Sequence, residues 1–166
     1  FMRNWEDDDG SPYCSVKEDF MDAAQVADKL SINLVQMNFA QKYKEKVFSY
    51  FLNELNKGKT PNPDIYCNKY IKFKEFTDYA FENGYDAVAT GHYSKIQVIN
   101  KEHFLCKSYD QSKDQTYFLS QVDRDIFSKI KFPLGNLLKT DVRKIAEKEN
   151  LITFDKKDST GICFIG

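Results

Sequence analysis

The residues best suited to chemistry lie on a short polar stretch, T-P-N-P-D-I-Y-C at residues 60–67. Proline fixes its own φ and holds the preceding residue extended, so residues 60–63 cannot be helical. Asp64 is then the predicted helix N-cap, which makes Cys67 the third helical residue. The positive end of a helix dipole favours the reactive thiolate there, although the nearby Asp64 carboxylate opposes it. An ordinary Pro-Asp cap followed by a small buried cysteine explains the same residues.

The spacing of the cysteines narrows the chemistry further. The four cysteines, at positions 14, 67, 106 and 163, include no C-x-x-C pair. This disfavours a zinc site, and the absence of a visible secretory signal favours a reducing compartment. Cys163 has apolar neighbours, where a cysteine is more often a core residue than a reactive one.

Two further segments present polar residues where α/β proteins bind ligands. Gly91 and His92 follow an apolar run at 85–90 that suits a buried parallel strand, at the carboxyl end where such sheets hold ligands. Gly91 would let a nucleotide approach the backbone, whereas a lone His92 is more simply a surface loop residue. In the loop 110–115, Lys113 and backbone N–H groups are suited to a phosphate, although a solvated cap is the simpler explanation of one lysine.

The elements that position these residues alternate between helix and strand, which predicts an α/β fold with a parallel sheet. A hairpin is expected over 94–108, and two short helices, the second capped by Thr140, form a small helical appendage. The predicted helices cover residues 15–31, 41–57, 64–83, 123–130 and 140–150, and the predicted strands cover 1–5, 32–39 and 85–90.

Length and composition exclude several classes of protein. A chain of 166 residues buries a real core and forms one domain, or one and part of another. A hydrophobic content of 42% excludes disorder, and 24 basic against 25 acidic residues leave only local patches for nucleic acid. The sequence contains no run of 18 apolar residues, so no membrane span is expected. No signal peptide is visible. Both ends fall within apolar patterns, so we expect a fragment of a longer protein.

Five motifs follow one another along the chain. They are F-M-R-N-W at 1–5, T-P-N-P-D-x-x-C-N-K at 60–69, A-T-G-H-Y at 89–93, S-K-D-Q-T-Y-F-L at 112–119 and D-S-T-G-I-C-F-I-G at 158–166. Together they resemble the tRNA-specific 2-thiouridylases (tRNA-uridine 2-sulfurtransferases). The resemblance implies a PP-loop ATPase domain of the adenine-nucleotide α-hydrolase type, a parallel sheet with helices on both faces, at residues 1–122. Residues 123–166 would then be part of a small helical central domain that carries the second catalytic cysteine.

The resemblance also implies an activity, ATP-dependent 2-thiolation of the wobble uridine of tRNAs with Lys, Glu or Gln anticodons. ATP would act with Mg²⁺ and without a protein-bound metal. Sulfur would come from a cysteine desulfurase, directly or through relay proteins, in the bacterial cytoplasm or, as the second choice, in mitochondria. The implied catalytic residues are Cys67, Cys163 and Asp64, the nucleotide contacts are Met2 and Gly91, and the tRNA contacts are Asn62, Pro63, Asp64, His92, Lys113, Asp114 and Gln115.

In the implied chemistry the C2 oxygen of uracil is adenylated, and a persulfide on Cys163 attacks C2. Cys67 then cleaves the S–S linkage, which leaves 2-thiouridine and a Cys67–Cys163 disulfide. Asp64 would move a proton or orient the base. Cys14 and Cys106 match no catalytic position and are expected to be structural.

The chain also departs from the family pattern. The phosphate loop S-G-G-x-D-S would lie upstream of Phe1, and a C-terminal β-barrel would lie beyond Gly166, so we expect residues 1–166 alone not to turn over ATP. Two other functions fit the residues. One is another PP-loop enzyme that modifies tRNA, which would not need Cys163, and the other is a non-catalytic RNA-binding or redox-responsive module.

Overall fold

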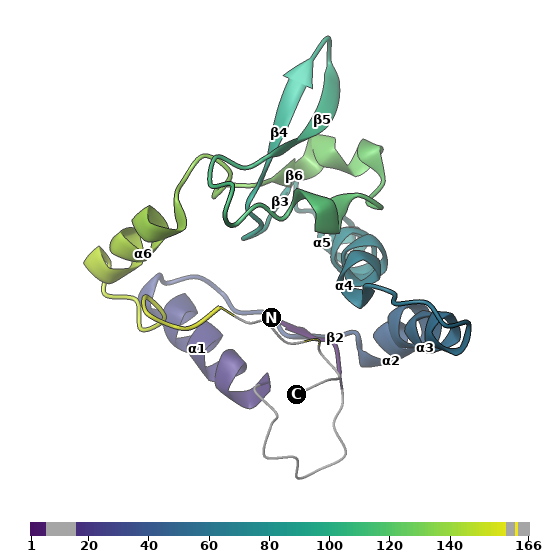
Figure 1. The fold of residues 1–166 in the computed structure, drawn as a ribbon. Helices are drawn as coiled ribbons and strands as arrows, with labels where there is room; N and C mark the ends of the chain where they lie inside the picture. Colours follow the sequence, from purple (N-terminus) through teal and green to yellow (C-terminus); the bar gives the residue numbers. More distant parts are fainter. Residues whose placement is uncertain (6–15, 159–161, 163–166) are drawn as a thin grey trace.

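A computed structural model describes residues 1–5, 16–158 and 162 of the chain (Figure 1). The described strands form three two-stranded sheets. The strands β1 (Met2–Arg3) and β2 (Met37–Asn38) pair in parallel, as do β3 (Val88–Ala89) and β6 (Ile130–Lys131). Helical segments lie between the two strands of each parallel pair, α1 between β1 and β2 and two 3₁₀ segments between β3 and β6, so the predicted α/β class is confirmed.

The first helical segments match the predicted ones closely. The helix α1 covers Val16–Lys29. A continuous helix then runs through α2 (Ala40–Tyr43), a π-helical segment η1 (Lys44–Phe48) and α3 (Ser49–Asn56). It ends where Gly58 adopts a φ of 73°, a left-handed conformation that glycine accepts without a steric penalty.

The next helix carries Cys67, and its start corrects the predicted cap. It runs through α4 (Pro63–Tyr66), the π-helical segment η2 (Cys67–Glu75) and α5 (Phe76–Glu82). Asn62, not Asp64, is the N-cap, because its side-chain oxygen accepts the Asp64 backbone N–H at 3.0 Å. Pro63 occupies the first helical position, where its missing N–H leaves no donor unsatisfied. Cys67 is therefore the fifth helical residue, beyond the first turn.

The hairpin predicted over residues 94–108 is present in the structure. The strands β4 (Ser94–Ile99) and β5 (Glu102–Lys107) pair antiparallel, with β5 starting one residue before the predicted position. The two turn residues, Asn100 and Lys101, have φ of 51° and 66°, which matches the twist of a two-residue hairpin turn. In Figure 1 the hairpin projects from the rest of the chain.

Residues 123–150 contain the main differences from prediction. The expected helix at 123–130 is a 3₁₀ segment η4 (Arg124–Lys129) followed by β6, which pairs with β3. The helix α6 covers Lys139–Lys148, and Thr140 is not its cap. Instead, the Asp110 side chain accepts the Lys139 backbone N–H at 2.9 Å, so a carboxylate from a distant loop satisfies this helix start.

Two apolar clusters meet at η2. The cluster around Cys67 contains Phe39, Tyr43, Val47 and Ile71. The second cluster contains Phe73 with the strand residues Val88 and Ile130, together with Ala80, Leu119, Val122 and Phe127. Each fully buried side chain of this kind contributes about 1.5–3 kcal/mol. Phe127 and Ile130 thus share a core with earlier residues, and the domain boundary after residue 122 stays a prediction.

The segment that follows α6 returns along α1, as Figure 1 shows. Lys29 donates to the Asn150 carbonyl oxygen at 2.9 Å, and the Lys156 ammonium pairs with Asp19 at 2.7 Å. Lys156 also pairs with Asp22. These contacts place residues 150–158 against α1. In the described part of the chain, no helix is long and apolar enough to cross a membrane.

Candidate functional site

Asp64 lies half-buried near the start of its helix, in the electrostatic field of one lysine. Burial raises the pKa of the Asp64 carboxyl above its ordinary value, and the positive charge of Lys72 opposes this rise. The positive charge of Lys72 also lowers the pKa of His92. Sequence reasoning missed Lys72, although its place on the Asp64 helix was a usable signal. A raised pKa caused by burial is one feature by which candidate acid–base groups are recognised.

Cys67 lies inside an apolar cluster, with only 4% of its surface exposed. Its neighbours in the cluster include Phe39, Tyr43 and Ile71. The structure therefore shows the small buried cysteine that was the simpler of the two interpretations of the sequence. Because Cys67 follows the first helical turn, the dipole acts on it more weakly than predicted. Met2, a predicted nucleotide contact, packs against the same cluster. Cys163 lies outside the described residues, so its pairing with Cys67 stays a prediction.

Several predicted contact residues gather at one pocket of about 360 Å³. It is lined by the predicted residues Gly91, Lys113, Asp114 and Gln115, together with Tyr93, Ser112, Lys139 and Asp158. At Gly91, no atom lies within 4 Å of the position that a Cβ would take. The backbone there is open to a ligand, as a nucleotide contact requires.

Hydrogen bonds explain why two distant segments meet at this pocket. The Gln115 backbone N–H donates to the Tyr93 carbonyl oxygen at 2.9 Å, and the Tyr93 N–H donates to the Gln115 side-chain oxygen at 3.0 Å. The Asp114 carboxylate accepts the N–H groups of Ser108 at 2.7 Å and Thr116 at 3.1 Å. Both predicted contact side chains therefore hold the loop in shape, and their contacts with tRNA stay predictions.

Lys113 is paired in the described structure. The ammonium groups of Lys113 and Lys139 each lie 2.9 Å from a different oxygen of Asp158. Hydrogen bonds from Lys113 and then from Lys139 lower the pKa of Asp158 to about 2. Sequence reasoning named neither Lys139 nor Asp158 as a site residue, although Asp158 opens the last of the five motifs.

His92 is buried, so its simpler interpretation as a surface loop residue is wrong. It is 9% exposed, and its ring lies 5.6 Å from that of Phe73 and 6.1 Å from that of Phe132. Its Nδ1 lies 2.9 Å from the Thr90 hydroxyl oxygen. Burial, with a smaller effect of Lys72, lowers the pKa of His92 to about 4. Its predicted contact with tRNA is not tested by this packing.

The burial of His92 predicts a pH-dependent stability. The folded chain holds His92 neutral, while an unfolded histidine takes up a proton below a pH of about 6.5. Stability from this residue is therefore full above pH 6.5 and falls as pH drops toward 4, by about 3 kcal/mol in total. The free energy of unfolding of wild type and His92→Asn, measured by urea titration between these pH values, should diverge accordingly.

His103→Asn is the matched control, because it changes the other histidine, which is half-buried on β5. If wild type and His92→Asn lost stability in parallel from pH 6.5 to 4, the conclusion that folding holds His92 neutral would be wrong.

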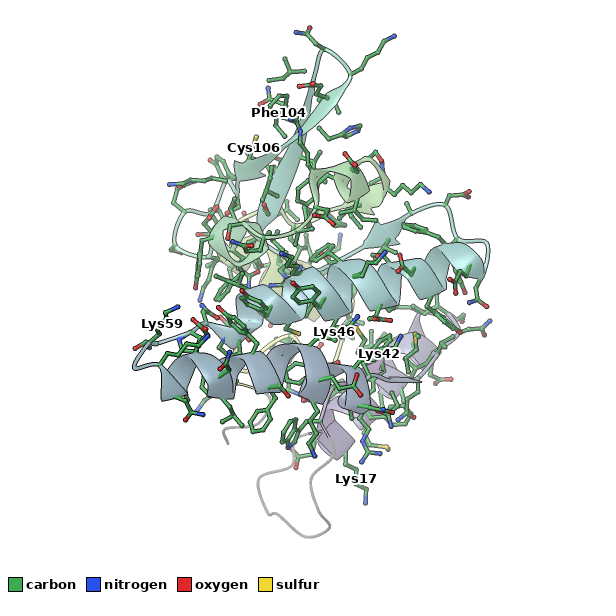
Figure 2. The ribbon with its side chains drawn as sticks, turned by 90° about the vertical axis from the view of Figure 1, so that its right-hand side faces the viewer. Lys17, Lys42, Lys46, Lys59, Phe104 and Cys106 are labelled. Carbon is green, nitrogen blue, oxygen red and sulfur yellow. The ribbon has the colours of Figure 1, made fainter. Side chains whose placement is uncertain are left out.

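Several surface lysines on or next to the two long helices are paired with carboxylates. Lys46 pairs with Glu75 at 2.8 Å, and Lys42 pairs with the same carboxylate. Lys59 pairs with Glu54 at 2.6 Å. Figure 2 shows Lys42 and Lys46 side by side between these helices. Lys113 and Lys139 are also paired, but both contact one carboxylate, Asp158, and line the pocket beside the predicted contact residues.

Comparison with known proteins identifies relatives over the whole chain. The chain is similar to proteins named tRNA-specific 2-thiouridylase MnmA from Chromobacterium violaceum, with 53% identity, and Neisseria meningitidis serogroup A, with 54% identity, both over 166 residues. A protein of the same name from Pediococcus pentosaceus is 50% identical over 167 aligned residues. All of the chain is covered, but only 43–45% of each relative, so the chain spans less than half of their length.

The family model described as "tRNA methyl transferase HUP domain" matches residues 1–166. This match agrees with the five motifs and with the parallel strand pairs, and it confirms the predicted PP-loop type of α/β fold. The chain belongs to the tRNA methyl transferase HUP domain family.

Proposed function

We propose that the protein containing this chain transfers sulfur to C2 of the wobble uridine of tRNA in an ATP-dependent reaction. The carrying observation is 50–54% identity over the entire chain to proteins named tRNA-specific 2-thiouridylases. The position of Asp64 and Cys67 three residues apart on one continuous helix supports the proposal, because side chains at this spacing are neighbours on a helix surface.

The proposed reaction uses two thiols and one activated carbonyl. ATP is a substrate: the C2 oxygen attacks its α-phosphorus, pyrophosphate leaves, and the adenylylated C2 oxygen becomes a leaving group. The terminal sulfur of a Cys163 persulfide attacks C2, and AMP leaves with the oxygen. The Cys67 thiolate then attacks the Cys163 sulfur, which breaks the S–S bond to the base and forms a Cys67–Cys163 disulfide. A reductant must then restore both thiols.

Each predicted site residue that the structure describes, apart from Cys67, has a proposed task in binding or proton transfer. Asn62, Pro63 and Asp64 would contact the target base, with the Asp64 carboxyl holding or moving a proton. Met2 and Gly91 would contact the nucleotide, and the open backbone at Gly91 fits this task. His92, Lys113, Asp114 and Gln115 would contact the tRNA. The described residues contain no cluster of three or more metal-ligating side chains, and Mg²⁺ would enter with ATP.

The proposed partners follow from the same chemistry. The substrate is a tRNA with a Lys, Glu or Gln anticodon, and the sulfur donor is a cysteine desulfurase acting directly or through relay proteins. The proposed location is the bacterial cytoplasm, with the mitochondrion as the second choice.

Reconstitution tests the proposed function. The full-length protein is incubated with ATP, Mg²⁺, unmodified tRNA and a cysteine desulfurase with cysteine, and the tRNA nucleosides are analysed by mass spectrometry. We expect 2-thiouridine at the wobble position and equal amounts of AMP, and neither product without ATP. Substrate turnover without any sulfur in the tRNA would contradict the proposal and favour another PP-loop tRNA-modifying reaction.

Asp64→Asn is expected to lower kcat for thiolation by about 10²-fold with little change in KM for tRNA. The amide keeps the size of the side chain but cannot take up or release a proton at neutral pH. The control is Asp78→Asn, which removes a partly exposed carboxylate that pairs with Lys74 on the same continuous helix. Equal kcat values for wild type and Asp64→Asn would exclude a proton-transfer role.

A further inference from the structure

We infer that Lys113 and Lys139 form a phosphate-binding site, which the Asp158 carboxylate occupies when no ligand is bound. This inference rests on the proposed function, because it takes the phosphate to belong to the tRNA or to ATP. It adds Lys139, Tyr93 and Asp158 to that site and assigns Asp158 the part of an internal competitor.

The geometry shows two cations converging on one anion. Lys113 comes from the loop after β5 and Lys139 from the first turn of α6, yet each ammonium lies 2.9 Å from its own Asp158 oxygen. The Arg143 guanidinium lies 3.9 Å from one of these oxygens. Two oxygens held by two cations is also how a phosphodiester would bind, since its single negative charge is shared by two non-bridging oxygens.

The pocket wall also contains a buried tyrosine. Tyr93 lines the pocket and is 5% exposed, and its buried hydroxyl has no hydrogen-bond partner among the described residues. A buried hydroxyl without a partner is costly, so this one requires a partner such as water or an ion. The Lys139 ammonium lies 5.8 Å from the Tyr93 ring centroid, so this lysine lies over the Tyr93 ring at the wall of the pocket.

The Asp158 contacts are suited to exchange. The side chain of Asp158 is 36% exposed and that of Lys113 is 42% exposed. Ion pairs at this exposure contribute only about 0–1 kcal/mol, so a phosphate at working concentration can displace the carboxylate. Asp158 should therefore lower the affinity for phosphate ligands by competition, without changing the lysines themselves.

Removing the competitor is the first test. Binding of a fluorescent anticodon stem-loop RNA and of ATP is measured separately with the full-length protein. Asp158→Asn should bind one of the two ligands about two- to five-fold more tightly, because the loss of a weak surface pair frees both lysines. The ligand that responds identifies the source of the phosphate. The control is Asp141→Asn. It removes a partly exposed carboxylate on α6 that pairs with Lys144 and not with Lys113 or Lys139.

Removing a cation is the second test. Lys139→Ala should reduce the slope of log affinity against log salt concentration by about 0.7 if the ligand is single-stranded RNA. Lys144→Ala is the matched control on α6, because its side chain is 76% exposed and does not line the pocket. For ATP as the ligand, the corresponding result is a loss of affinity in Lys139→Ala and not in Lys144→Ala.

The triple variant Lys113→Ala, Lys139→Ala, Asp158→Asn makes the assignment specific. The triple variant should bind the ligand no more tightly than the double variant Lys113→Ala/Lys139→Ala, since Asp158 competes only for those two lysines. A gain that persists without the lysines, or a gain equal to that of Asp141→Asn, would overturn the inference. Thiolation by these variants is followed in parallel: normal thiolation with unchanged binding refutes only the phosphate site, whereas no thiolation by wild type refutes only the proposed function.

Discussion

Replacing Cys67 with alanine in the full-length protein is expected to reduce formation of 2-thiouridine by about 10³-fold or more. In the proposed reaction the Cys67 thiolate breaks the S–S bond that joins the base to Cys163. A methyl group cannot attack sulfur, so the base stays attached to the enzyme. Cys163→Ala should give an equal loss, because it removes the atom that carries the persulfide. Mass spectrometry of tRNA nucleosides from cells carrying each variant measures both effects.

Stability must be separated from chemistry in this experiment, because Cys67 is 4% exposed within an apolar cluster. Alanine leaves a small cavity there without adding a buried polar group, and thermal unfolding checks that the variant folds. Cys106→Ala is the matched control, since Cys106 is a half-buried thiol on β5 that matches no catalytic position (Figure 2). Normal 2-thiouridine in both Cys67→Ala and Cys163→Ala would contradict the two-thiol mechanism.

The cysteine variants also separate the competing functions. A PP-loop enzyme that modifies tRNA by another reaction would keep its activity in Cys163→Ser. A non-catalytic RNA-binding module would bind tRNA equally well with either cysteine replaced and would form no product. Only sulfur transfer through a disulfide requires both thiols.

Gly135→Ala is expected to lower the free energy of unfolding by about 3 kcal/mol. A Cβ at this buried glycine would lie 2.1 Å from the Ser94 carbonyl oxygen and 2.6 Å from the Lys95 side chain. The carbonyl belongs to β4, where Ser94 is fully buried and its hydroxyl donates to the Cys106 carbonyl oxygen at 3.1 Å. Backbone held in this way cannot move aside cheaply, so the hairpin must shift as a whole.

Urea denaturation of the full-length protein measures this effect, with Gly91→Ala as the matched control. At Gly91 a Cβ would meet no atom within 4 Å, so its stability should stay within about 0.5 kcal/mol of wild type. A Gly135→Ala protein as stable as Gly91→Ala would show that the residues around 135 do not pack against β4 as described.

The sequence alone determined the features that depend on neighbouring residues. The hairpin followed from alternating side chains around Asn100 and Lys101, because both the pattern and the turn conformation are local. The end of α3 at Gly58 was predicted for the same reason. Even the cap error was small, since Asn62 and Asp64 are both good caps and the side-chain bond selected Asn62.

Only the tertiary structure decided what depends on residues far apart in the chain. The strand β6 is two residues long, too short for a periodic pattern, and it exists because Val88 offers a partner for Ile130. His92 is buried because Phe73 and Phe132 close around it from other segments. The pairing of Lys113 and Lys139 with Asp158 joins three positions in a way that no spacing along the chain encodes. Local propensity acts over a few residues, whereas burial and charge pairing are set only when the whole chain has packed.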